Sequence, residues 1–387
     1  MSEAAIRQAL ILAGGKGTRL GEITRKVPKP MLPIAGRPFL DHLVEMIERH
    51  GYEDILLLGG YLGEVLEAAY DKRRIGGAAI RVMREKVPLG TAGALTVARE
   101  KLDPRFLMMN GDAFFDINLR ALEQASRQSG ATATLALRSV DNATRYGRVI
   151  EDEGKIVAFM EKDLSRPGPG VINGGIYVLK REILDLVRGL PCSLEQDVFP
   201  ALVERGEIRG KAFDGYFLDI GLPETLEQGR RELPEVRLRP AAIFERDTLV
   251  VLVGSDSPES FQWRKGAVEA IRTLNDLGYY VLVSSHHSGA AREVNAAIQE
   301  QLAAEGAHVD RFYVELEAAP SATPGQARRK PGSSLLSEAM NEWPIVGERS
   351  FGVSVSVDNI EAARSAGIAG HLYDGGDLAR LVHSLLA

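Results

Sequence analysis

An apolar run that breaks into glycines, Arg7-Gln-Ala-Leu-Ile-Leu-Ala-Gly-Gly-Lys-Gly-Thr-Arg-Leu20, decides the fold class of this chain. Residues 7–13 form a short segment that is continuously apolar from Ala9, which is typical of a strand buried in a parallel sheet. Gly14 and Gly15 end that strand. A glycine-rich turn leaves backbone N–H groups free and lets a phosphate approach with no Cβ in the way. The stretch therefore predicts an α/β fold with a candidate anion site after its first strand.

Strand and helix patterns alternate beyond this turn. Strands are expected at 54–59, 80–83 and 106–109, and helices at 38–50, 63–70 and 91–101. This alternation predicts a Rossmann-like domain whose parallel sheet is covered on both faces. Short strand candidates with few helices between them follow at 131–137, 147–151, 156–159 and 175–179. They predict an antiparallel addition, and so a mixed, mainly parallel sheet.

The length of 387 residues predicts two domains, because single cores usually stop growing at about 250–300 residues. We expect the first domain over 1–233 and a linker over 234–240, where two prolines stand among alternating charges. A smaller α/β domain over 241–387 follows, with strands at 241–244 and 280–284 and a helix at 265–277. Residues 318–333 form its most loop-like stretch.

Charge and composition exclude several classes of partner. The net charge is −6, so no global field favours nucleic acid or an anionic membrane. No apolar run approaches the ~20 residues that span a bilayer. The single cysteine, Cys192, cannot close an internal disulfide or build a thiolate zinc site, which predicts a reducing cytoplasm. Cys192 itself is expected to be a small buried hydrophobe rather than a nucleophile.

Two cations lie in and after the glycine turn. Arg19 lies inside it, and Lys29 stands between Pro28 and Pro30, which stiffen the backbone around it. The turn is neither a Walker A motif nor the dinucleotide Gly-x-Gly-x-x-Gly. One interpretation of Lys29 is a solvated side chain in a proline-rich turn. The other is that Arg19 and Lys29 converge on a triphosphate, since fixed cations suit an anion that gains charge as pyrophosphate leaves.

Two carboxylates complete the candidate chemistry. Asp112 follows the strand at 106–109, at the edge of an open α/β sheet where ligands bind. Asp219 has a similar setting in Phe217-Leu-Asp-Ile-Gly221. Mg²⁺ prefers one or two protein carboxylates plus substrate phosphates, so the pair predicts a Mg²⁺ site. A lone Asp at such a place is often only a helix cap or a turn former.

These motifs together resemble the sugar-1-phosphate nucleotidylyltransferases. The resemblance rests on Leu12–Leu20 with Pro28–Pro33, on Pro88-Leu-Gly-Thr-Ala-Gly-Ala94, on Asn110-Gly-Asp112 and on Asp219-Ile-Gly221, in the order of the family. It spans nearly all of residues 6–230. Further motifs are most similar to the D-glycero-α-D-manno-heptose-1-phosphate guanylyltransferases: Tyr146-Gly-Arg-Val149, Ile172-Asn-Gly-Gly-Ile-Tyr177, Ser193-Leu-Glu-Gln-Asp-Val-Phe-Pro200 and Gly215-Tyr-Phe-Leu-Asp-Ile-Gly221.

The resemblance implies a role for each matching residue. Catalysis would fall to the cations and acids, Arg19 on the β- and γ-phosphates, Lys29 on the α-phosphate, and Asp112 and Asp219 on Mg²⁺. The nucleotide would be held by Leu12, Ala13, Gly14, Gly15, Gly17, Thr18, Glu85, Gly90, Thr91, Gly93 and Asn110. The sugar 1-phosphate would meet Tyr146, Gly147, Glu161, Lys162, Asn173 and Gly174. Some of these have a structural alternative, since residues 173–175 form an ordinary turn sequence and Glu161 with Lys162 an ordinary surface pair.

The function expected is transfer of a nucleotidyl group from an NTP, with GTP favoured, to a sugar 1-phosphate, with heptose 1-phosphate favoured. Other enzymes that act on hexose 1-phosphates, including mannose-1-phosphate guanylyltransferases, share much of the pattern. A non-catalytic sugar-nucleotide sensor on the same fold is the alternative outside enzymes. The intact set of Arg19, Lys29, Asp112 and Asp219 favours the enzyme. The sequence leaves the base, the sugar and a homo-oligomeric state open.

The second domain resembles haloacid-dehalogenase-type phosphatases of the heptose-bisphosphatase kind. The resemblance rests on Ala242-Ile-Phe-Glu-Arg-Asp-Thr248, Ser284-Ser-His-His-Ser-Gly289, Arg329-Lys-Pro-Gly332 and residues 350–367. Glu245 stands where the nucleophilic Asp would be. The Gly-Asp pair of the last motif falls on Ser354 and Val355, and its later acid falls on Asn359, with Asp358 one residue away. We expect an inactive pseudophosphatase. A docking module, a sugar-phosphate pocket retained by Lys330, Ser285 and Asp247, and a bifunctional enzyme remain as alternatives.

Overall fold

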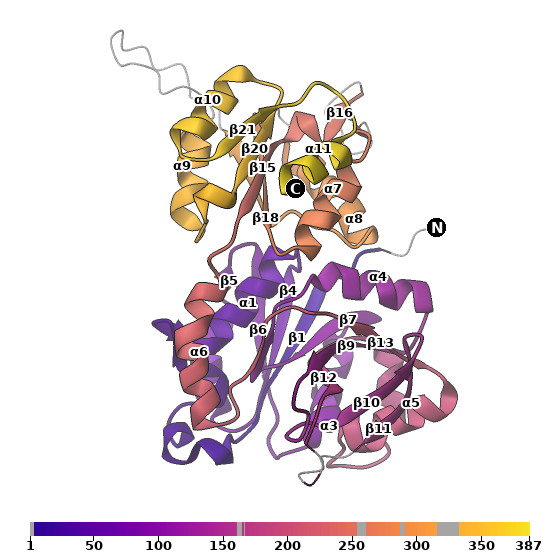
Figure 1. The fold of residues 1–387 in the computed structure, drawn as a ribbon. Coiled ribbons are helices and arrows are strands. Elements are labelled where there is room, and N and C mark those ends of the chain that lie inside the picture. Colours follow the sequence, from indigo (N-terminus) through magenta and orange to yellow (C-terminus); the bar gives the residue numbers. More distant parts are fainter. Residues whose placement is uncertain (1–3, 161–164, 166, 254–260, 287–290, 316–332) are drawn as a thin grey trace. The chain divides into compact units, whose positions relative to one another are not determined.

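The structure is a computed structural model that describes residues 4–160, 165, 167–253, 261–286, 291–315 and 333–387. The chain divides into two compact units, Glu3–Pro234 and Glu235–Ala387, each with its own sheet (Figure 1). Helix α6 (Pro223–Val236) includes Pro234, so the first three residues of the expected linker 234–240 are helical. None of the described helices is both long and apolar enough to cross a bilayer.

The first unit is built on one ten-stranded sheet. Its order is β10 (Arg148–Asp152), β11 (Lys155–Met160), β13 (Ile208–Ala212), β9 (Ala133–Val140), β12 (Gly170–Lys180), β7 (Arg105–Asn110), β1 (Gln8–Ala13), β4 (Asp54–Gly59), β6 (Ala78–Arg84), β5 (Arg74–Ile75). Neighbours are parallel in β7-β1-β4-β6 and in β13-β9, and antiparallel elsewhere. The mixed sheet is thus confirmed, but parallel pairing dominates only in the half that contains β1.

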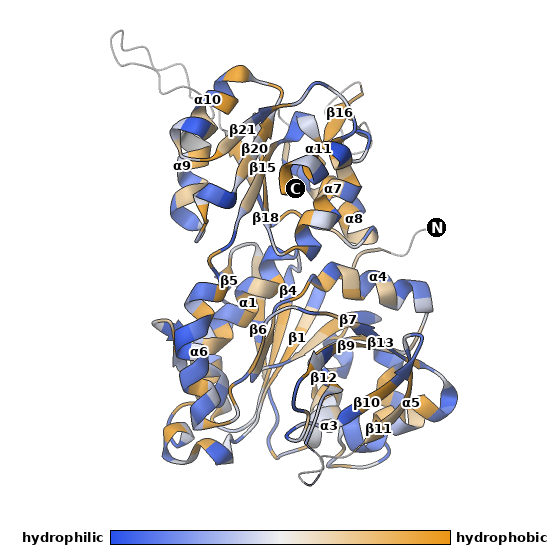
Figure 2. Cartoon of the chain, in the orientation of Figure 1, coloured by the Kyte–Doolittle hydropathy of each residue, from blue (hydrophilic) through white to orange (hydrophobic). Residues whose placement is uncertain are grey.

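The parallel half is held together by apolar strands that are buried on both faces. Leu10 of β1 stands in register between Leu56 of β4 and Met108 of β7, and all three side chains are fully buried. Their strands carry mainly hydrophobic colour in Figure 2. Because the three strands are parallel, the chain leaves each of them at the same edge of the sheet. The glycine turn, Gly60 and Asp112 therefore emerge side by side.

The helices of this unit are α1 (Phe39–Arg49), α2 (Gly63–Tyr70), α3 (Gly90–Val97), α4 (Leu119–Ser129), α5 (Phe199–Arg205) and α6. Of these, α1, α2 and α3 lie where the sequence pattern predicts helices, whereas α4, α5 and α6 were not predicted. Helix α2 packs against β4 and β6, while α4 packs against β9, β12 and β13. The expected helix 91–101 is α3 followed by a separate 3-10 turn, Arg99–Lys101.

A small second sheet in this unit brings two distant segments together. Strand β8 (Ala113–Phe115) pairs with β14 (Phe217–Asp219) in antiparallel register, with Asp219 opposite Ala113. Phe115 packs edge-on against Phe217 at a ring-centroid distance of 5.6 Å, so side-chain contacts stabilise the pairing of the two strands. The carboxylate-bearing ends of two segments about a hundred residues apart in sequence are joined in this way.

The second unit is an α/β unit with an entirely parallel five-stranded sheet. Its order is β19 (Arg311–Glu315), β18 (Tyr280–His286), β15 (Ala241–Glu245), β20 (Phe351–Ser354), β21 (Ala369–Leu372). Its helices are α7 (Ala267–Asp276), α8 (Ala291–Ala304), α9 (Ser333–Glu342), α10 (Val357–Ser365) and α11 (Leu378–Leu386). A short hairpin of β16 (Val250–Leu252) and β17 (Phe261–Trp263) lies outside that sheet. The loop-like stretch predicted at 318–333 lies outside the described residues except for Ser333.

Candidate active site

The glycine turn after β1 packs closely against the turn after β4, with little room for a Cβ at Gly14 and less at Gly60. A Cβ on Gly14 would lie 3.0 Å from Glu85 Oε1, and one on Gly60 would lie 2.4 Å from the same oxygen and 2.9 Å from the Gly14 carbonyl. The Tyr61 N–H donates to the Gly14 carbonyl at 3.1 Å. The turns after β1 and β4 thus form one continuous wall beside the Glu85 carboxylate.

This wall encloses a cavity of about 630 Å³ at the carboxyl edge of the parallel half. Nine predicted residues line it: Leu12, Gly14, Gly15, Lys29, Glu85, Gly90, Thr91, Asn110 and Asp112. The cavity is also lined by residues for which the sequence predicted no binding role: Lys16, Pro30, Leu58, Gly60, Tyr61, Lys86, Val87, Pro88, Ala94 and Gly111. A volume of this size suits a small organic ligand.

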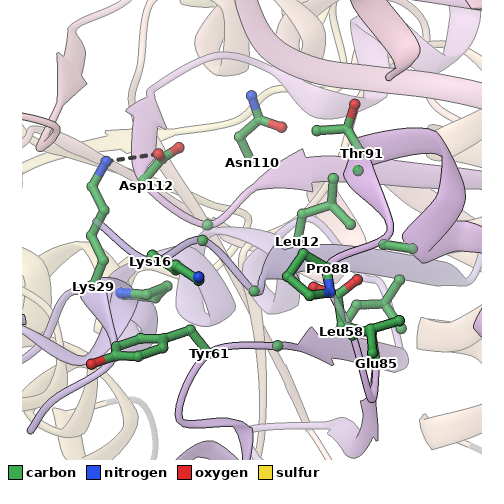
Figure 3. Close-up of a pocket in the computed structure, with 18 of the residues that line it drawn as sticks. Leu12, Lys16, Lys29, Leu58, Tyr61, Glu85, Pro88, Thr91, Asn110 and Asp112 are labelled. Atoms are coloured by element: carbon green, nitrogen blue, oxygen red, sulfur yellow. Dashed lines mark hydrogen bonds and ion pairs between the residues drawn. The ribbon is translucent and has the colours of Figure 1, made fainter. Parts of the chain in front are cut away.

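The cavity has two chemically different ends. Figure 3 shows Lys29 and Asp112 at one end and Glu85, Pro88 and Thr91 at the other. The first end offers charged groups, and the second combines a carboxylate with apolar and hydroxyl side chains. This difference between the two ends of the cavity matches a ligand with a charged part and a heteroaromatic part.

Four predicted nucleotide residues do not line the cavity. Ala13 is buried within β1, and Gly17, with a φ of 61°, begins the 3-10 turn η1 (Thr18–Thr24). A Cβ on Gly93 would lie 2.7 Å from Leu190 Cδ2, so this glycine admits the 189–193 loop against α3. Gly17 and Gly93 thus shape the backbone around the cavity. Thr18, in η1, is exposed outside it.

Lys29 and Asp112 form an ion pair at the charged end. Lys29 Nζ lies 2.7 Å from Asp112 Oδ2, and the lysine is buried while its partner is half-exposed. Lys29 begins the 3-10 turn η2 (Lys29–Met31), and the Met31 N–H donates to the Pro28 carbonyl at 2.8 Å. The local turn and the two prolines therefore hold the lysine in place, which supports the interpretation of a fixed cation.

Asp219 lies beside this pair. The Ile220 N–H donates to the Asp112 carbonyl at 3.0 Å, which locks the end of β14 to the turn after β7. Burial and the neighbouring Asp112 carboxylate raise the pKa of Asp219, while Lys29 and the Gly221 N–H, 2.6 Å from Oδ1, oppose that rise. The structure thus brings together both predicted acids and the predicted lysine.

Arg19 lies within η1, with its side chain exposed and outside the lining of the cavity. Its guanidinium nevertheless acts on the same group of residues, since it opposes the rise in the pKa of both Asp219 and Tyr146. Arg19 therefore lies close enough to Asp219 and Tyr146 to act on them electrostatically, although it is not part of the cavity wall.

The donor set of Asp112 and Asp219 fits a hard divalent cation. Two carboxylates that face each other favour a cation that offsets their repulsion, and Mg²⁺ takes one or two such ligands together with phosphate oxygens. Over the described ranges, no group of three or more His, Cys, Asp or Glu side chains is arranged to hold a metal. A cation here would thus take its remaining ligands from water or from a bound phosphate.

The residues predicted to bind the sugar 1-phosphate are of two kinds. Some have side chains near Asp112 and Asp219, and others are glycines that allow neighbouring groups to pack closely. Tyr146 packs edge-on against Phe217 at 6.0 Å, and burial followed by the Asp219 carboxylate raises the pKa of its phenol. A Cβ on Gly147 would lie 3.0 Å from the Met160 carbonyl. A Cβ on Gly174 would lie 2.5 Å from the Phe115 ring, so Gly174 is required by packing. Glu161 and Lys162 lie outside the described residues.

Asn173 belongs to a hydrogen-bonded network that the sequence did not reveal. Its Nδ2 donates to the Tyr177 hydroxyl at 2.8 Å, and that hydroxyl lies 3.5 Å from Glu195 Oε1. Glu195 also accepts from Thr91 Oγ1 at 3.0 Å. The network therefore joins β12 to the helix that lines the cavity.

Glu195 and Gly60 are the main residues missed from sequence. Glu195 lies in the π-helical turn η5 (Leu194–Val198), a form for which the local sequence gives no clear signal. Gly60 could have been found, because it follows the predicted strand 54–59 in the same way that Gly14 follows the first strand. The packing of the turn after β1 against the turn after β4 depends on the tertiary structure and has no local sequence signal.

Residues 8–235 match the Nucleotidyl transferase family, and the chain belongs to this family. Over 230 residues it is 37% identical to the mannose-1-phosphate guanylyltransferase of Mycobacterium tuberculosis, covering 58% of this chain and 64% of that protein. The chain thus spans slightly less than two thirds of that relative.

Two further relatives are spanned almost completely. The D-glycero-alpha-D-manno-heptose 1-phosphate guanylyltransferase of Aneurinibacillus thermoaerophilus is 34% identical over 228 residues, covering 58% of this chain and 98% of the relative. The crystal structure of HddC from Yersinia pseudotuberculosis, also solved with GMP-PN, is 29% identical with a TM-score of 0.53, covering 59% of this chain and all of that chain. The similarity to both relatives covers a length close to that of the first unit.

Proposed function

We propose that the first unit transfers a guanylyl group from GTP to a sugar 1-phosphate, releasing pyrophosphate, with heptose 1-phosphate as the preferred sugar. The observation that carries this proposal is the convergence of three charged residues: Lys29 and Asp112 line the charged end of the cavity, and Asp219 lies beside them. A site that merely stores a sugar nucleotide has no need to hold two carboxylates together. Family membership and the named relatives support the same reaction class.

The reaction requires no nucleophile from the protein. An oxygen of the sugar 1-phosphate, already anionic, bonds to the α-phosphorus of GTP, and the bond from that phosphorus to the bridging oxygen breaks as pyrophosphate leaves. Lys29 and Arg19 would neutralise the phosphates, and Gly14 with Gly15 would admit them to backbone N–H groups. Asp112 and Asp219 would hold Mg²⁺, which supplies charge neutralisation between two mutually repelling anions when bound.

Glu85 supports guanine as the base. Its carboxylate is held at the apolar end of the cavity, where the Leu89 N–H donates to Oε2 at 3.2 Å. Burial raises the pKa of Glu85, and the Leu89 N–H opposes that rise. Guanine presents two adjacent donors, N1–H and the N2 amino group, whereas uracil and thymine present one N–H between two carbonyls. An acceptor pair fixed at this end therefore favours guanine.

The choice of sugar rests on similarity rather than on a described contact. The heptose relative aligns over almost its whole length, whereas the mannose relative is slightly more identical over a smaller share of its own. Mannose 1-phosphate is therefore the second candidate. Pyrophosphate release should be measured for each nucleoside triphosphate against heptose, mannose, glucose and amino-sugar 1-phosphates. No release with any pair would refute transfer and favour a sugar-nucleotide sensor.

We propose that the second unit is a phosphatase-like domain without phosphatase activity. Glu245 ends β15, the central strand, and its Oε2 accepts from the Ser354 hydroxyl and from the Val355 N–H at 3.1 Å. It is 7% exposed. A carboxylate used in this way by its own chain is a poor nucleophile and a poor cation ligand.

The alternative of a retained sugar-phosphate pocket has less support. Ser285 is buried and Asp247 has a mostly exposed side chain, while Lys330 lies outside the described residues. Assay of the full chain with heptose 1,7-bisphosphate and Mg²⁺ tests the proposal. We expect no phosphate release above a protein-free blank, and clear Mg²⁺-dependent release would establish a bifunctional enzyme instead.

A further inference from the structure

The Lys29 side chain has little freedom along its stem. It is buried between Pro28 and Pro30, and a Cβ added at Gly17 would lie 3.4 Å from Lys29 Cβ. The backbone and the first methylene are therefore enclosed by η1 and η2. The outer part of the side chain reaches into the charged end of the cavity (Figure 3).

The ammonium lies among the groups that a divalent cation would use. Nζ is 2.7 Å from Asp112 Oδ2, and it opposes the repulsion that Asp112 exerts on Asp219. The backbone places the same ammonium near both acids, since a Cβ on Gly221 would lie 3.5 Å from Nζ and 2.7 Å from Asp219 Oδ1. One positive charge is thus shared by two carboxylates.

A cation that takes Asp112 must compete with this ammonium. Charged groups in a partly buried site interact strongly, and a buried ammonium without a partner is costly. A bound nucleotide would offer Lys29 a phosphate in exchange for Asp112. The two events therefore favour each other: the cation releases the lysine, and the phosphate receives it.

We propose that Lys29 is a built-in counter-ion of the acid pair, which holds Asp112 in the free protein and exchanges it for a nucleotide phosphate when the divalent cation binds. This inference rests on the proposed function, in which the same acids hold Mg²⁺. It assigns Lys29 two successive partners. The free protein consequently has a weaker cation site than its two carboxylates alone would give.

The test is binding of Mn²⁺ alone to the full-length chain without nucleotide, followed by the electron paramagnetic resonance signal of free Mn²⁺. In Lys29→Met, removal of the competing charge should tighten Mn²⁺ binding by about tenfold or more. Lys180→Met is the matched control, because it removes an equal charge that lies 3.7 Å from Glu182 and away from the acids. Its Mn²⁺ affinity should equal that of the unmodified chain.

Two further variants guard against misfolding and indirect effects. Lys29→Gln keeps a hydrogen-bond donor without the charge and should also tighten Mn²⁺ binding. Adding Asp112→Asn to Lys29→Met should abolish the gain. Circular dichroism establishes that each variant is folded. Equal or weaker Mn²⁺ binding by folded Lys29→Met and Lys29→Gln, including no detectable binding by any form, would overturn the exchange.

Pyrophosphate release by the unmodified chain is measured separately. If release occurs and the affinities do not change, the exchange fails while the proposed function stands. If no sugar 1-phosphate supports release but Lys29→Met tightens Mn²⁺ binding, the competition at Asp112 stands and the proposed reaction fails.

Discussion

Asp112 shows how one residue combines two tasks at this site, one through its side chain and one through its backbone. Its Oδ2 accepts a hydrogen bond from the buried Lys29 ammonium. Its backbone carbonyl accepts a hydrogen bond from the Ile220 N–H, which fixes the end of β14. The second contact uses the backbone and survives any side-chain replacement. Side-chain chemistry at this position is therefore separable from the local fold.

Asp112→Asn should reduce pyrophosphate release by about a hundredfold or more, since it removes a carboxylate that would hold the Mg²⁺ that neutralises the phosphates. The backbone contact remains, so the chain should still fold by circular dichroism, although its melting temperature should fall because the buried Lys29 ammonium loses its ion-pair partner. Asp185→Asn, which alters an exposed pair with Arg99, is the control and should retain full turnover. Near-normal release from folded Asp112→Asn would remove Asp112 from the catalytic groups.

Glu85→Gln tests base recognition. An amide offers one acceptor and one donor, which suits the mixed edge of uracil or thymine better than the two donors of guanine. The ratio of kcat/KM for GTP to that for UTP should fall by at least about tenfold, because a good bidentate base contact contributes about 1–3 kcal/mol of discrimination. An unchanged ratio would place guanine recognition elsewhere.

At the scale of elements, helix α4 is attached by a buried charge cluster. Arg120 donates to the Ile6 carbonyl at 2.8 Å and the His50 carbonyl at 2.7 Å, and pairs with Glu123 at 2.5 Å. Its guanidinium lies 4.0 Å from the centre of the Tyr52 ring. One side chain thus ties α4 to the segment before β1 and to the end of α1.

Arg120→Met should lower the free energy of unfolding by about 3–5 kcal/mol, because it leaves the buried Glu123 carboxylate without its closest partner. Chemical denaturation monitored by circular dichroism measures the loss. Arg99→Met, which breaks the exposed pair with Asp185, should cost no more than about 1 kcal/mol. Similar losses for the two variants would mean that the cluster adds little.

Strand and helix patterns predicted the elements around the site well, because each has a strong local signal. The apolar run at 54–59 and the helix expected at 63–70 correspond to β4 and α2 with the observed bounds. The β8–β14 pairing could not be foreseen, since two three-residue strands carry no periodicity and meet only through tertiary packing. The acids were identified by resemblance and by their place after strands, but their proximity depends on this pairing.

At the scale of the whole molecule, each of the two units has its own internal packing. The first closes with α6, in which a Cβ on Gly229 would lie 2.6 Å from Leu218 Cδ2, so the helix packs closely over β14. The second has its own buried core around Phe244, Val283 and Val353. The relatives that align over nearly their whole length correspond to the first unit.

A chain of residues 1–236 should therefore fold alone and release pyrophosphate at the rate of the full chain. A chain that ends at Leu222 lacks α6 and should fail to fold, because Leu218 and Ile34 would lose their cover. Size-exclusion chromatography and circular dichroism report the folding of each. Loss of turnover by a folded 1–236 chain would show that the second unit contributes to catalysis.

The change of strand direction at β12 has a consequence for how substrate specificity can change. Strands β7 and β1 carry turns that line the cavity, whereas β12 runs the opposite way and carries Asn173. Asn173 is nevertheless connected through Tyr177 and Glu195 to Thr91 in the wall of the cavity. We therefore expect a substitution at Asn173 that alters the choice of sugar phosphate to alter nucleotide affinity as well, so the two specificities cannot be tuned independently.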